Sequence, residues 1–272
     1  MAQGGLKLSS EVVALIPAAG QATRLGPLPC SKEMLPIGSV SPGPGRRSRA
    51  KAVCEYLLES MRAADITKAH LILRAGKWDI PAYLGDGSNF GIHLSYLLMR
   101  LSFGVPYTLD QAFPFVRHSI VALGFPDIIF EPRDAFARVL DCLAATRADV
   151  VLGLFPADQP ENTDMVECEE SGRVRSLIIK QRNTMLRYGW VIAVWTPEFT
   201  RFLHSYVAMD SDRATQNPGV GGDLETRELF VGDVIQAAIN SGIHVHGLVI
   251  PDGEFLDIGT PGNLEEARRR YQ

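Results

Sequence analysis

The sequence predicts a three-layer α/β/α fold built on a mainly parallel central sheet, and three observations support this. Uninterrupted apolar runs of strand length, such as Val12–Pro17 and Val150–Phe155, are typical of strands buried on both faces. Segments with helical periodicity, such as Ala52–Ala64, alternate with these runs, as the connections of a parallel sheet require. A chain of 272 residues with 46% hydrophobic side chains is long enough for one sizeable core. We therefore expect a single domain over residues 1–272.

Each expected element follows from its local pattern: strands where apolar, β-branched or aromatic residues run together, and helices where apolar residues recur on one face. The predicted strands are Val12–Pro17, Ala69–Arg74, Leu94–Met99, Ser119–Leu123, Ile128–Phe130, Val150–Phe155, Tyr188–Trp195 and His244–Ile250, with a hairpin over Asp164–Lys180. The predicted helices are Ala52–Ala64, Trp78–Leu84, Arg133–Leu143, Pro197–Val207, Glu228–Ser241 and a last helix that Thr260 caps. We expect irregular structure over Ser39–Arg49, Arg100–Ala112 and Met209–Gly222.

Composition argues against several classes of protein. The formal net charge of −4 is unlike that of a nucleic-acid-binding surface. The four cysteines lack the spacing of metal ligands or of a disulfide framework. No apolar run approaches the length of a membrane span, and Met1–Ser10 lacks the apolar segment of a signal peptide. We therefore expect a cytoplasmic protein with free thiols that binds neither nucleic acid nor membrane.

The chain is organised around Val12–Ile37, where an apolar strand leads into a turn of small residues and then two cations. Ala18, Ala19 and Gly20 have little or no side chain, so the backbone amides of Ala18–Gln21 can approach a phosphate. Arg24 adds a planar fork of donors and Lys32 a point charge, and both suit phosphate oxygens. These features predict a site for a nucleoside triphosphate. For any lone glycine turn, a tight turn with surface cations is the simpler alternative.

Two motifs in this stretch occur in a fixed order: Ala18–Leu25 reads AAGQATRL, and Ser31–Ile37 reads SKEMLPI. The pair resembles the N-terminal signature of the sugar-phosphate nucleotidylyltransferases, AAGxGTRL followed by SKxxLPI, and most of all the glucose-1-phosphate thymidylyltransferase branch. Ala22 replaces the family's second glycine. The resemblance covers nearly the whole chain. It implies a Rossmann-like fold of the nucleotide-diphospho-sugar transferase type, and transfer of an NMP from an NTP to a sugar 1-phosphate with release of pyrophosphate.

Two aspartates stand out by position. Asp127 follows an apolar strand and a Gly-Phe-Pro turn, at the edge where open α/β sheets bind ligands. Asp257 directly precedes the sequence Ile258-Gly259-Thr260-Pro261. Each aspartate alone fits equally well as a turn or capping residue. Together they resemble the metal-binding pair of the family, which implies a Mg²⁺ site completed by phosphate oxygens and water.

The resemblance also implies roles for individual residues. Gln111 matches a family glutamine beside base and sugar, and Met99 falls where the thymidylyl branch has a base-contacting glutamine. Lys180 matches the lysine of a glutamate–lysine pair near the sugar phosphate, and Gly189 matches a strand glycine that borders the sugar. The implied catalytic residues are Arg24, Lys32 and Asp127; the nucleotide-binding residues are Ala18, Ala19, Gly20, Gln21, Arg24 and Gln111; the substrate-binding residues are Lys180 and Gly189; and the metal ligands are Asp127 and Asp257.

Several alternatives stay open at this point. Ile179 and Trp190, which replace expected sugar-side residues, allow another acceptor such as phosphocholine. A non-catalytic nucleotide-sugar sensor with the same fold is an alternative from a different class. The arginines of 46–49 form either a solvated surface loop or a basic flap near the polyphosphate. The expected partners are an NTP and a sugar 1-phosphate. A homo-oligomer is an open alternative to a monomer, because the sequence does not define the oligomeric state.

Overall fold

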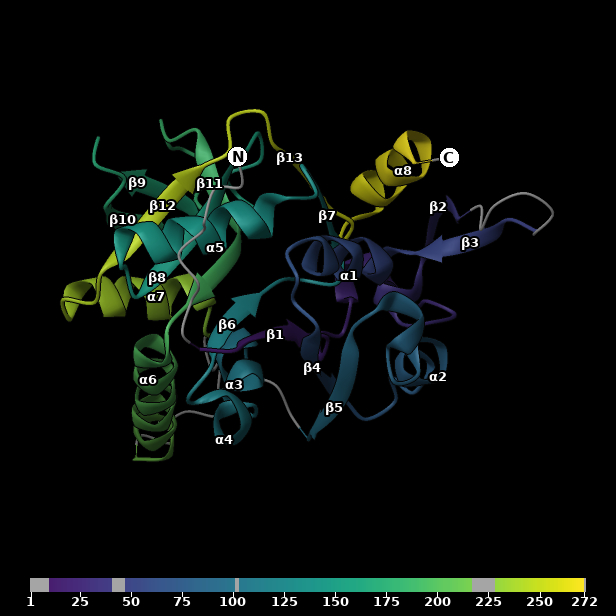
Figure 1. The fold of residues 1–272 in the computed structure, drawn as a ribbon, viewed down its shortest axis with the longest axis horizontal. Coiled ribbons are helices and arrows are strands. Elements are labelled where there is room, and N and C mark those ends of the chain that lie inside the picture. Colours follow the sequence, from purple (N-terminus) through teal and green to yellow (C-terminus); the bar gives the residue numbers. More distant parts are fainter. Residues whose placement is uncertain (1–9, 41–46, 101–102, 217–227, 272) are drawn as a thin grey trace, which may run out of the picture.

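The computed structural model describes residues 10–40, 47–100, 103–216 and 228–271, and its elements are arranged as Figure 1 shows. The strands are β1 Val12–Pro17, β2 Pro36–Val40, β3 Arg49–Ala52, β4 Lys68–Arg74, β5 His93–Met99, β6 Ile120–Leu123, β7 Ile128–Glu131, β8 Val150–Pro156, β9 Met165–Cys168, β10 Val174–Ile178, β11 Tyr188–Trp195, β12 Val245–Val249 and β13 Glu254–Asp257. The α-helices are α1 Val53–Ala63, α2 Asp79–Leu84, α3 Val105–Asp110, α4 Phe113–Val116, α5 Ala135–Thr146, α6 Pro197–Gln216, α7 Val231–Asn240 and α8 Pro261–Arg270. Short 3-10 turns are η1 Thr23–Leu25, η2 Lys32–Met34 and η3 Ser88–Phe90.

Nine of the described strands form the central sheet. β1 lies between β4 and β6 and is parallel to both, and β5 is parallel to β4. On the other side of β6, β11 runs antiparallel to β6 and β8, while β12 is parallel to β8. The carboxyl ends of β1, β4 and β6 therefore meet at one edge, which is where ligands bind in open α/β sheets.

Helices cover both faces of this sheet (Figure 1). Side chains of β1 alternate between the two faces, because successive residues of a strand point in opposite directions. Ala14 and Ile16 belong to the core beneath α1 and α5, whereas Val13 and Leu15 belong to the core beneath α3, α4, α6 and α7. Two cores on opposite faces of one sheet make three layers, so the predicted α/β/α architecture is confirmed.

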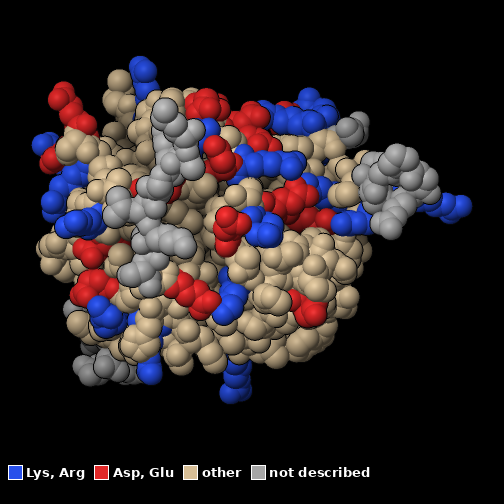
Figure 2. Space-filling model, in the orientation of Figure 1, with Lys and Arg blue, Asp and Glu red and all other residues tan. Residues whose placement is uncertain are grey.

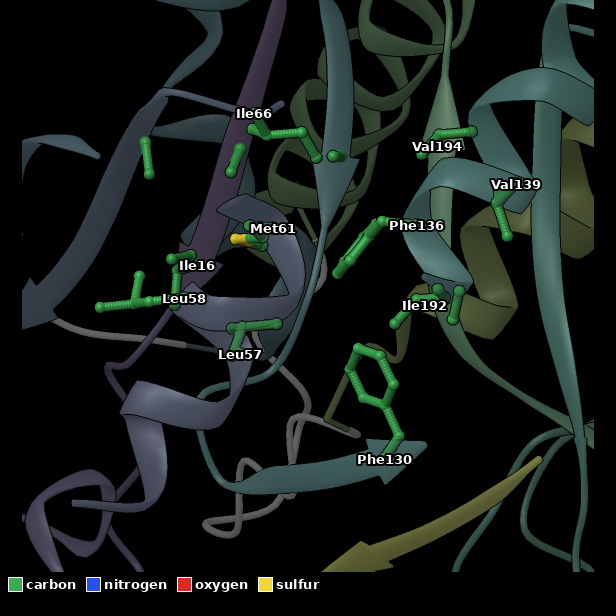
Figure 3. Packing of buried hydrophobic residues seen from close by; sticks show 14 of the residues in the cluster. Ile16, Leu57, Leu58, Met61, Ile66, Phe130, Phe136, Val139, Ile192 and Val194 are labelled. Atoms are coloured by element: carbon green, nitrogen blue, oxygen red, sulfur yellow. The ribbon is translucent and has the colours of Figure 1, made fainter. Parts of the chain in front are cut away.

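Figure 3 shows part of the core between α1 and α5. Leu57 and Met61 extend from α1, and Phe136 extends from α5. Phe130 of β7 packs edge-on against Phe136, with ring centroids 5.9 Å apart. This contact fixes β7 against the main core, although β7 itself pairs with β13 in a separate two-stranded sheet. None of the helices within the described residues is long and apolar enough to cross a bilayer.

The structure corrects three expectations. Residues 105–110, expected to be irregular, form α3, with a proline in its first turn, where no amide partner is needed. The helix expected to stop at Val207 continues to Gln216; its polar side chains hid the continuation, and the rest of the loop expected over 209–222 lies outside the described residues. Glu254–Asp257 forms strand β13, which the sequence does not predict. The local pattern does not reveal it because its pairing partner, β7, is more than a hundred residues away in sequence.

Candidate active site

A cavity of about 1080 Å³ opens at the carboxyl ends of β1 and β6. Its walls come from the turn after β1, from η2, from the segment between β6 and β7, from the residues that flank β9 and β10, and from α7 and β13. Most of the predicted site residues lie here or beside it. On the face that Figure 2 shows, acidic and basic side chains are mixed.

The turn after β1 presents backbone amides to the cavity. Ala18 is buried, and its amide donates to the carbonyl of Ile72 on β4 over 2.9 Å, so this residue anchors the turn and its amide is not available to a ligand. Ala19, Gly20 and Gln21 line the cavity. The amides of Gly20 and Gln21 donate to no acceptor within the described part of the chain. Amides exposed at a turn of small residues form a seat for a phosphate.

Ala22 adopts the left-handed conformation, with φ of 56° and ψ of 31°. A side chain with a Cβ pays a steric cost of about 1–2 kcal/mol in this region, which glycine avoids. The family pattern has glycine at this position, and the backbone explains why. The chain keeps the turn with alanine, at a cost in stability.

Lys32 points toward this turn from η2. A Cβ added to Gly20 would lie 3.8 Å from the Lys32 ammonium group. Ser31, which precedes Lys32, is held by Asp79: its amide and its hydroxyl each donate to that carboxylate over 2.7 Å. The ammonium group donates to Asp127 Oδ2 over 2.5 Å. Burial lowers the pKa of Lys32. The charge of Asp127 and this hydrogen bond, together with the charges of Glu33 and Asp257, more than offset burial, so the pKa is raised and the lysine stays charged.

The two-stranded β7–β13 sheet brings Asp257 close to Asp127. In the β7–β13 ladder, Asp257 pairs with Ile128, the residue after Asp127, and the amide of Ile258 donates to the carbonyl of Asp127 over 3.0 Å. The amide of Gly259 donates to Asp257 Oδ1 over 2.7 Å. Burial raises the pKa of Asp257, and the charge of Asp127 raises it further. The two aspartates therefore face a shared space, but Asp257 ends a strand of the small sheet and not of the central one.

Arg24 lies at the outer side of this cluster. Its side chain is 58% exposed, and Nη2 lies 4.0 Å from Asp257 Oδ2. Such an exposed ion pair contributes little to stability, so the arginine is free to turn toward a ligand. The structure thus brings Arg24, Lys32, Asp127 and Asp257 together around the turn after β1.

The donor chemistry of the two aspartates fits a divalent metal ion. Their carboxylates are hard oxygen ligands, and their mutual repulsion, visible in the raised pKa of Asp257, is what a bound cation would relieve. No group of three or more histidine, cysteine or acidic side chains that could hold a metal occurs within the described residues. A metal here would therefore need further oxygen ligands from substrate phosphates and water, as is usual for Mg²⁺.

A second group of residues lies around the β9–β10 hairpin. Lys180 lines the cavity, and its ammonium group stands 3.7 Å from the centre of the Phe230 ring. Asp164 and Trp190 line the cavity too, although the sequence motifs assign no role to Asp164. Its position directly before the apolar run Met165–Val166, at the start of a predicted strand, was the one available signal.

Three sequence assignments find no support in the cavity. Gln111 does not line it; its side chain donates to the carbonyl of Tyr107 over 3.4 Å at the end of α3. Met99 is buried in the core and does not line the cavity. Gly189 does not line the cavity either: a Cβ there would lie 2.2 Å from Thr163 Cγ2, so this glycine serves close packing.

Arg49 has a structural role. Its guanidinium group forms a two-pronged ion pair with Glu55, with both N–O distances 2.7 Å, and it also donates to the Tyr83 hydroxyl. Glu55 in turn accepts the amide of Ala52 at the start of α1. Arg49 thus fastens β3 to α1, while Arg46 lies outside the described residues.

The sheet order, the cavity at its carboxyl edge and the paired aspartates define a protein of the nucleotide-diphospho-sugar transferase fold, and solved structures agree. A UTP-bound UGPase of Acinetobacter baumannii superposes with a TM-score of 0.70 at 15% identity, covering 96% of this chain and 93% of that one. A Bacillus anthracis protein, provisionally described as a glucose-1-phosphate thymidylyltransferase, gives a TM-score of 0.76 at 18% identity, with 96% and 95% coverage.

Curated proteins confirm the resemblance to sugar-phosphate nucleotidylyltransferases. The chain is 26% identical over 260 residues to a glucose-1-phosphate thymidylyltransferase of Streptomyces griseus, and 25% identical over 258 residues to that of Neisseria gonorrhoeae. It is also 22% identical to the low-salt glycan biosynthesis nucleotidyltransferase Agl11 of Haloferax volcanii. These matches cover 93–94% of this chain, but it spans only 65%, 80% and 64% of the three relatives, respectively. No protein-family model matches it.

Proposed function

We propose that the protein transfers a nucleotidyl group from an NTP to a sugar 1-phosphate, giving an NDP-sugar and pyrophosphate. The observation that carries the proposal is that Lys32, Asp127 and Asp257 meet in one cavity, at a turn with exposed amides. Arg24 stands at the outer side of this group, 4.0 Å from Asp257. The names of the relatives, which include thymidylyltransferases and a UDP-glucose pyrophosphorylase, support the same reaction class.

In this reaction the protein's own residues position and neutralise charge. The attacking phosphate has a second pKa of about 6 and is already ionised near neutral pH, so no general base is needed. The amides at Gly20 and Gln21 seat the triphosphate, and Lys32 and Arg24 stabilise the charge that develops on the leaving pyrophosphate. Lys180 binds the acceptor phosphate. Asp127 and Asp257 are the residues that would hold Mg²⁺, which supplies neutralisation of the phosphate charge.

The charge of the cavity supports a need for a cation. Carboxyl groups along its walls outnumber lysine and arginine side chains, and a triphosphate adds further negative charge. The acids are Glu33, Asp127, Asp158, Asp164, Glu228, Glu254, Asp257 and Glu266, and the bases are Lys32, Arg74, Arg100, Lys180 and Arg270. A divalent ion bound with the nucleotide removes part of this excess.

The decisive experiment incubates the purified protein with each NTP and a panel of sugar 1-phosphates, with Mg²⁺ or with EDTA, and measures pyrophosphate. Phosphocholine belongs in the panel as the non-sugar acceptor. Release that needs an NTP, a sugar 1-phosphate and Mg²⁺ together is the expected result. Nucleotide binding without any turnover would instead assign the chain to the sensor class. Cytoplasmic location and assembly as a homo-oligomer complete the proposal, and cell fractionation and light scattering test them.

A further inference from the structure

Asp164 lines the cavity, and one oxygen of its carboxyl group is unpaired among the described residues. The residue is only 8% exposed, yet it lines the cavity just before β9. Its Oδ2 accepts a hydrogen bond from the Trp190 indole over 3.3 Å, whereas Oδ1 is buried and has no hydrogen-bond partner in the described part of the chain. A buried carboxyl oxygen without a partner is costly to stability, so such a group calls for a partner that is not part of the protein.

The surrounding residues make room for this side chain. A Cβ on Gly232, at the start of α7, would lie 2.5 Å from Asp164 Oδ2. A Cβ on Gly189 of β11 would meet Thr163 at 2.2 Å and the carbonyl oxygen of Asp164 at 3.3 Å. The backbone amide of Trp190 donates to that carbonyl over 3.3 Å. Two glycines and a tryptophan from two separate elements thus hold the carboxyl group in one place.

The neighbouring lysine, Lys180, does not pair with Asp164, so Oδ1 stays available to a ligand. The Lys180 ammonium group lies on the face of the Phe230 ring, and it forms no ion pair with Asp164 within the described residues. Burial raises the pKa of Asp164, Lys180 and the Trp190 hydrogen bond oppose this, and Asp233 adds to it. This part of the cavity therefore offers a cation for a phosphate group beside an acceptor for a hydrogen-bond donor.

We propose that Asp164 Oδ1 accepts a hydrogen bond from a hydroxyl or amino group of the phosphorylated acceptor, and that Asp164 determines which acceptor is used. This inference rests on the proposed function, because it concerns the second substrate of that reaction. Hydroxyl and amino groups share the donor chemistry that the oxygen lacks. A site built to bind such a donor discriminates strongly against an analogue without it.

The test compares Asp164→Asn and Asp164→Leu with Glu170→Gln, which removes one exposed carboxylate from the same hairpin outside the cavity. Each variant is assayed by pyrophosphate release with glucose 1-phosphate, its monodeoxy analogues and glucosamine 1-phosphate. We expect both Asp164 variants to raise KM for the best sugar phosphate by about 10- to 100-fold, the scale of one hydrogen bond to a charged group. KM for the NTP should change less than twofold, and Glu170→Gln should behave as wild type.

The same assays show whether the group that donates to Asp164 is a hydroxyl or an amino group of the acceptor substrate. One monodeoxy analogue should be poor with wild type and no poorer with Asp164→Asn, which identifies a hydroxyl group. A penalty in Asp164→Asn that is larger for glucosamine 1-phosphate than for glucose 1-phosphate identifies an amino group. Unchanged acceptor KM in both folded Asp164 variants overturns the inference and leaves the proposed function intact. Absence of turnover by wild type with every acceptor overturns both.

Discussion

The ammonium group of Lys32 and the carboxyl group of Asp127 lie 2.5 Å apart, although 95 positions separate them in the chain. The pair joins η2 to the segment that enters β7. Both side chains are largely buried, with 16% and 12% exposure. In the absence of substrate each group neutralises the other, and a charged substrate has to compete for both of them. The pair therefore links binding at the phosphate seat to the candidate metal site.

Loss of Lys32 should affect turnover far more than loss of an ordinary surface lysine. We expect Lys32→Ala to lower kcat by about 10²-fold or more, the scale of one preorganised electrostatic group, and Arg24→Ala to do the same. Lys68→Ala is the control, because Lys68 forms an exposed ion pair with Glu11 over 2.6 Å. Steady-state pyrophosphate release measures all three. Wild-type rates in both the Lys32 and Arg24 variants would refute the assignment of this site.

The two aspartates should differ when metal is absent. Asp257→Asn removes a charge that repels Asp127, so its melting temperature without metal should hold or rise. Asp127→Asn instead leaves the buried Lys32 without its partner and should lower that temperature. Both variants should lose activity by orders of magnitude and lose the extra stabilisation that Mg²⁺ gives with nucleotide. Thermal melts with and without Mg²⁺ and NTP measure this; a full metal response in both variants would exclude a metal site here.

The left-handed conformation of Ala22 predicts a stabilising substitution. Ala22→Gly removes the steric cost at φ of 56° but adds flexibility to the unfolded chain, so the free energy of unfolding should rise by about 0.5–1 kcal/mol. Ala144→Gly, in the last turn of α5, should instead lower it, by no more than the roughly 0.5–1 kcal/mol that glycine costs in the middle of a helix. Chemical denaturation of both variants measures the difference. Equal changes of the same sign would mean that the turn is not strained.

A buried ion pair beside the site should be sensitive to loss of one partner. Lys77 donates to Glu33 over 2.6 Å, and their side chains are 6% and 1% exposed. Within the residues that the structure describes, Glu33 Oε2 has no hydrogen-bond partner. Lys77→Met should destabilise the protein by about 3–5 kcal/mol, because it leaves a buried charge alone. Adding Glu33→Gln should recover part of this loss. A double-mutant cycle by denaturation tests the coupling; additive losses would show that the pair is not coupled.

The raised pKa of Asp164 makes stability depend on pH in a defined direction. The folded state holds this proton more tightly than the unfolded chain, so the group costs stability as pH rises from the ordinary aspartate pKa of about 3.9 through its raised value. Asp164→Asn lacks this titration. Its stability relative to wild type should therefore improve as pH rises across that window, whereas Glu170→Gln should show no such trend. Denaturation midpoints from pH 3.5 to pH 8 provide the measurement.

The parts of the site that sequence could predict are those encoded within one short window. The turn and Lys32 lie within fifteen residues of each other, and their chemistry is written in the residue types. Asp257 stands out because a glycine and a capped helix follow it, and its assignment to a metal site comes from the resemblance to the family. The strand β13 and the place of Asp164 in the cavity could not be predicted, because each depends on a partner that is distant in sequence: β7 for β13, and Trp190 for Asp164. Gln111 lies outside the cavity, and motif matching cannot show that its amide turns back to Tyr107.

The small β7–β13 sheet makes loss of activity separable from global unfolding. Asp257 is held in position by a ladder of four residue pairs that is separate from the central sheet. Local opening of such a short ladder costs less than global unfolding. Mild denaturant or a cut in the segment after β12 can therefore withdraw one carboxylate while both main cores stay folded. A preparation can then look intact by circular dichroism and be inactive, so the folded fraction of a sample is not a measure of its active fraction.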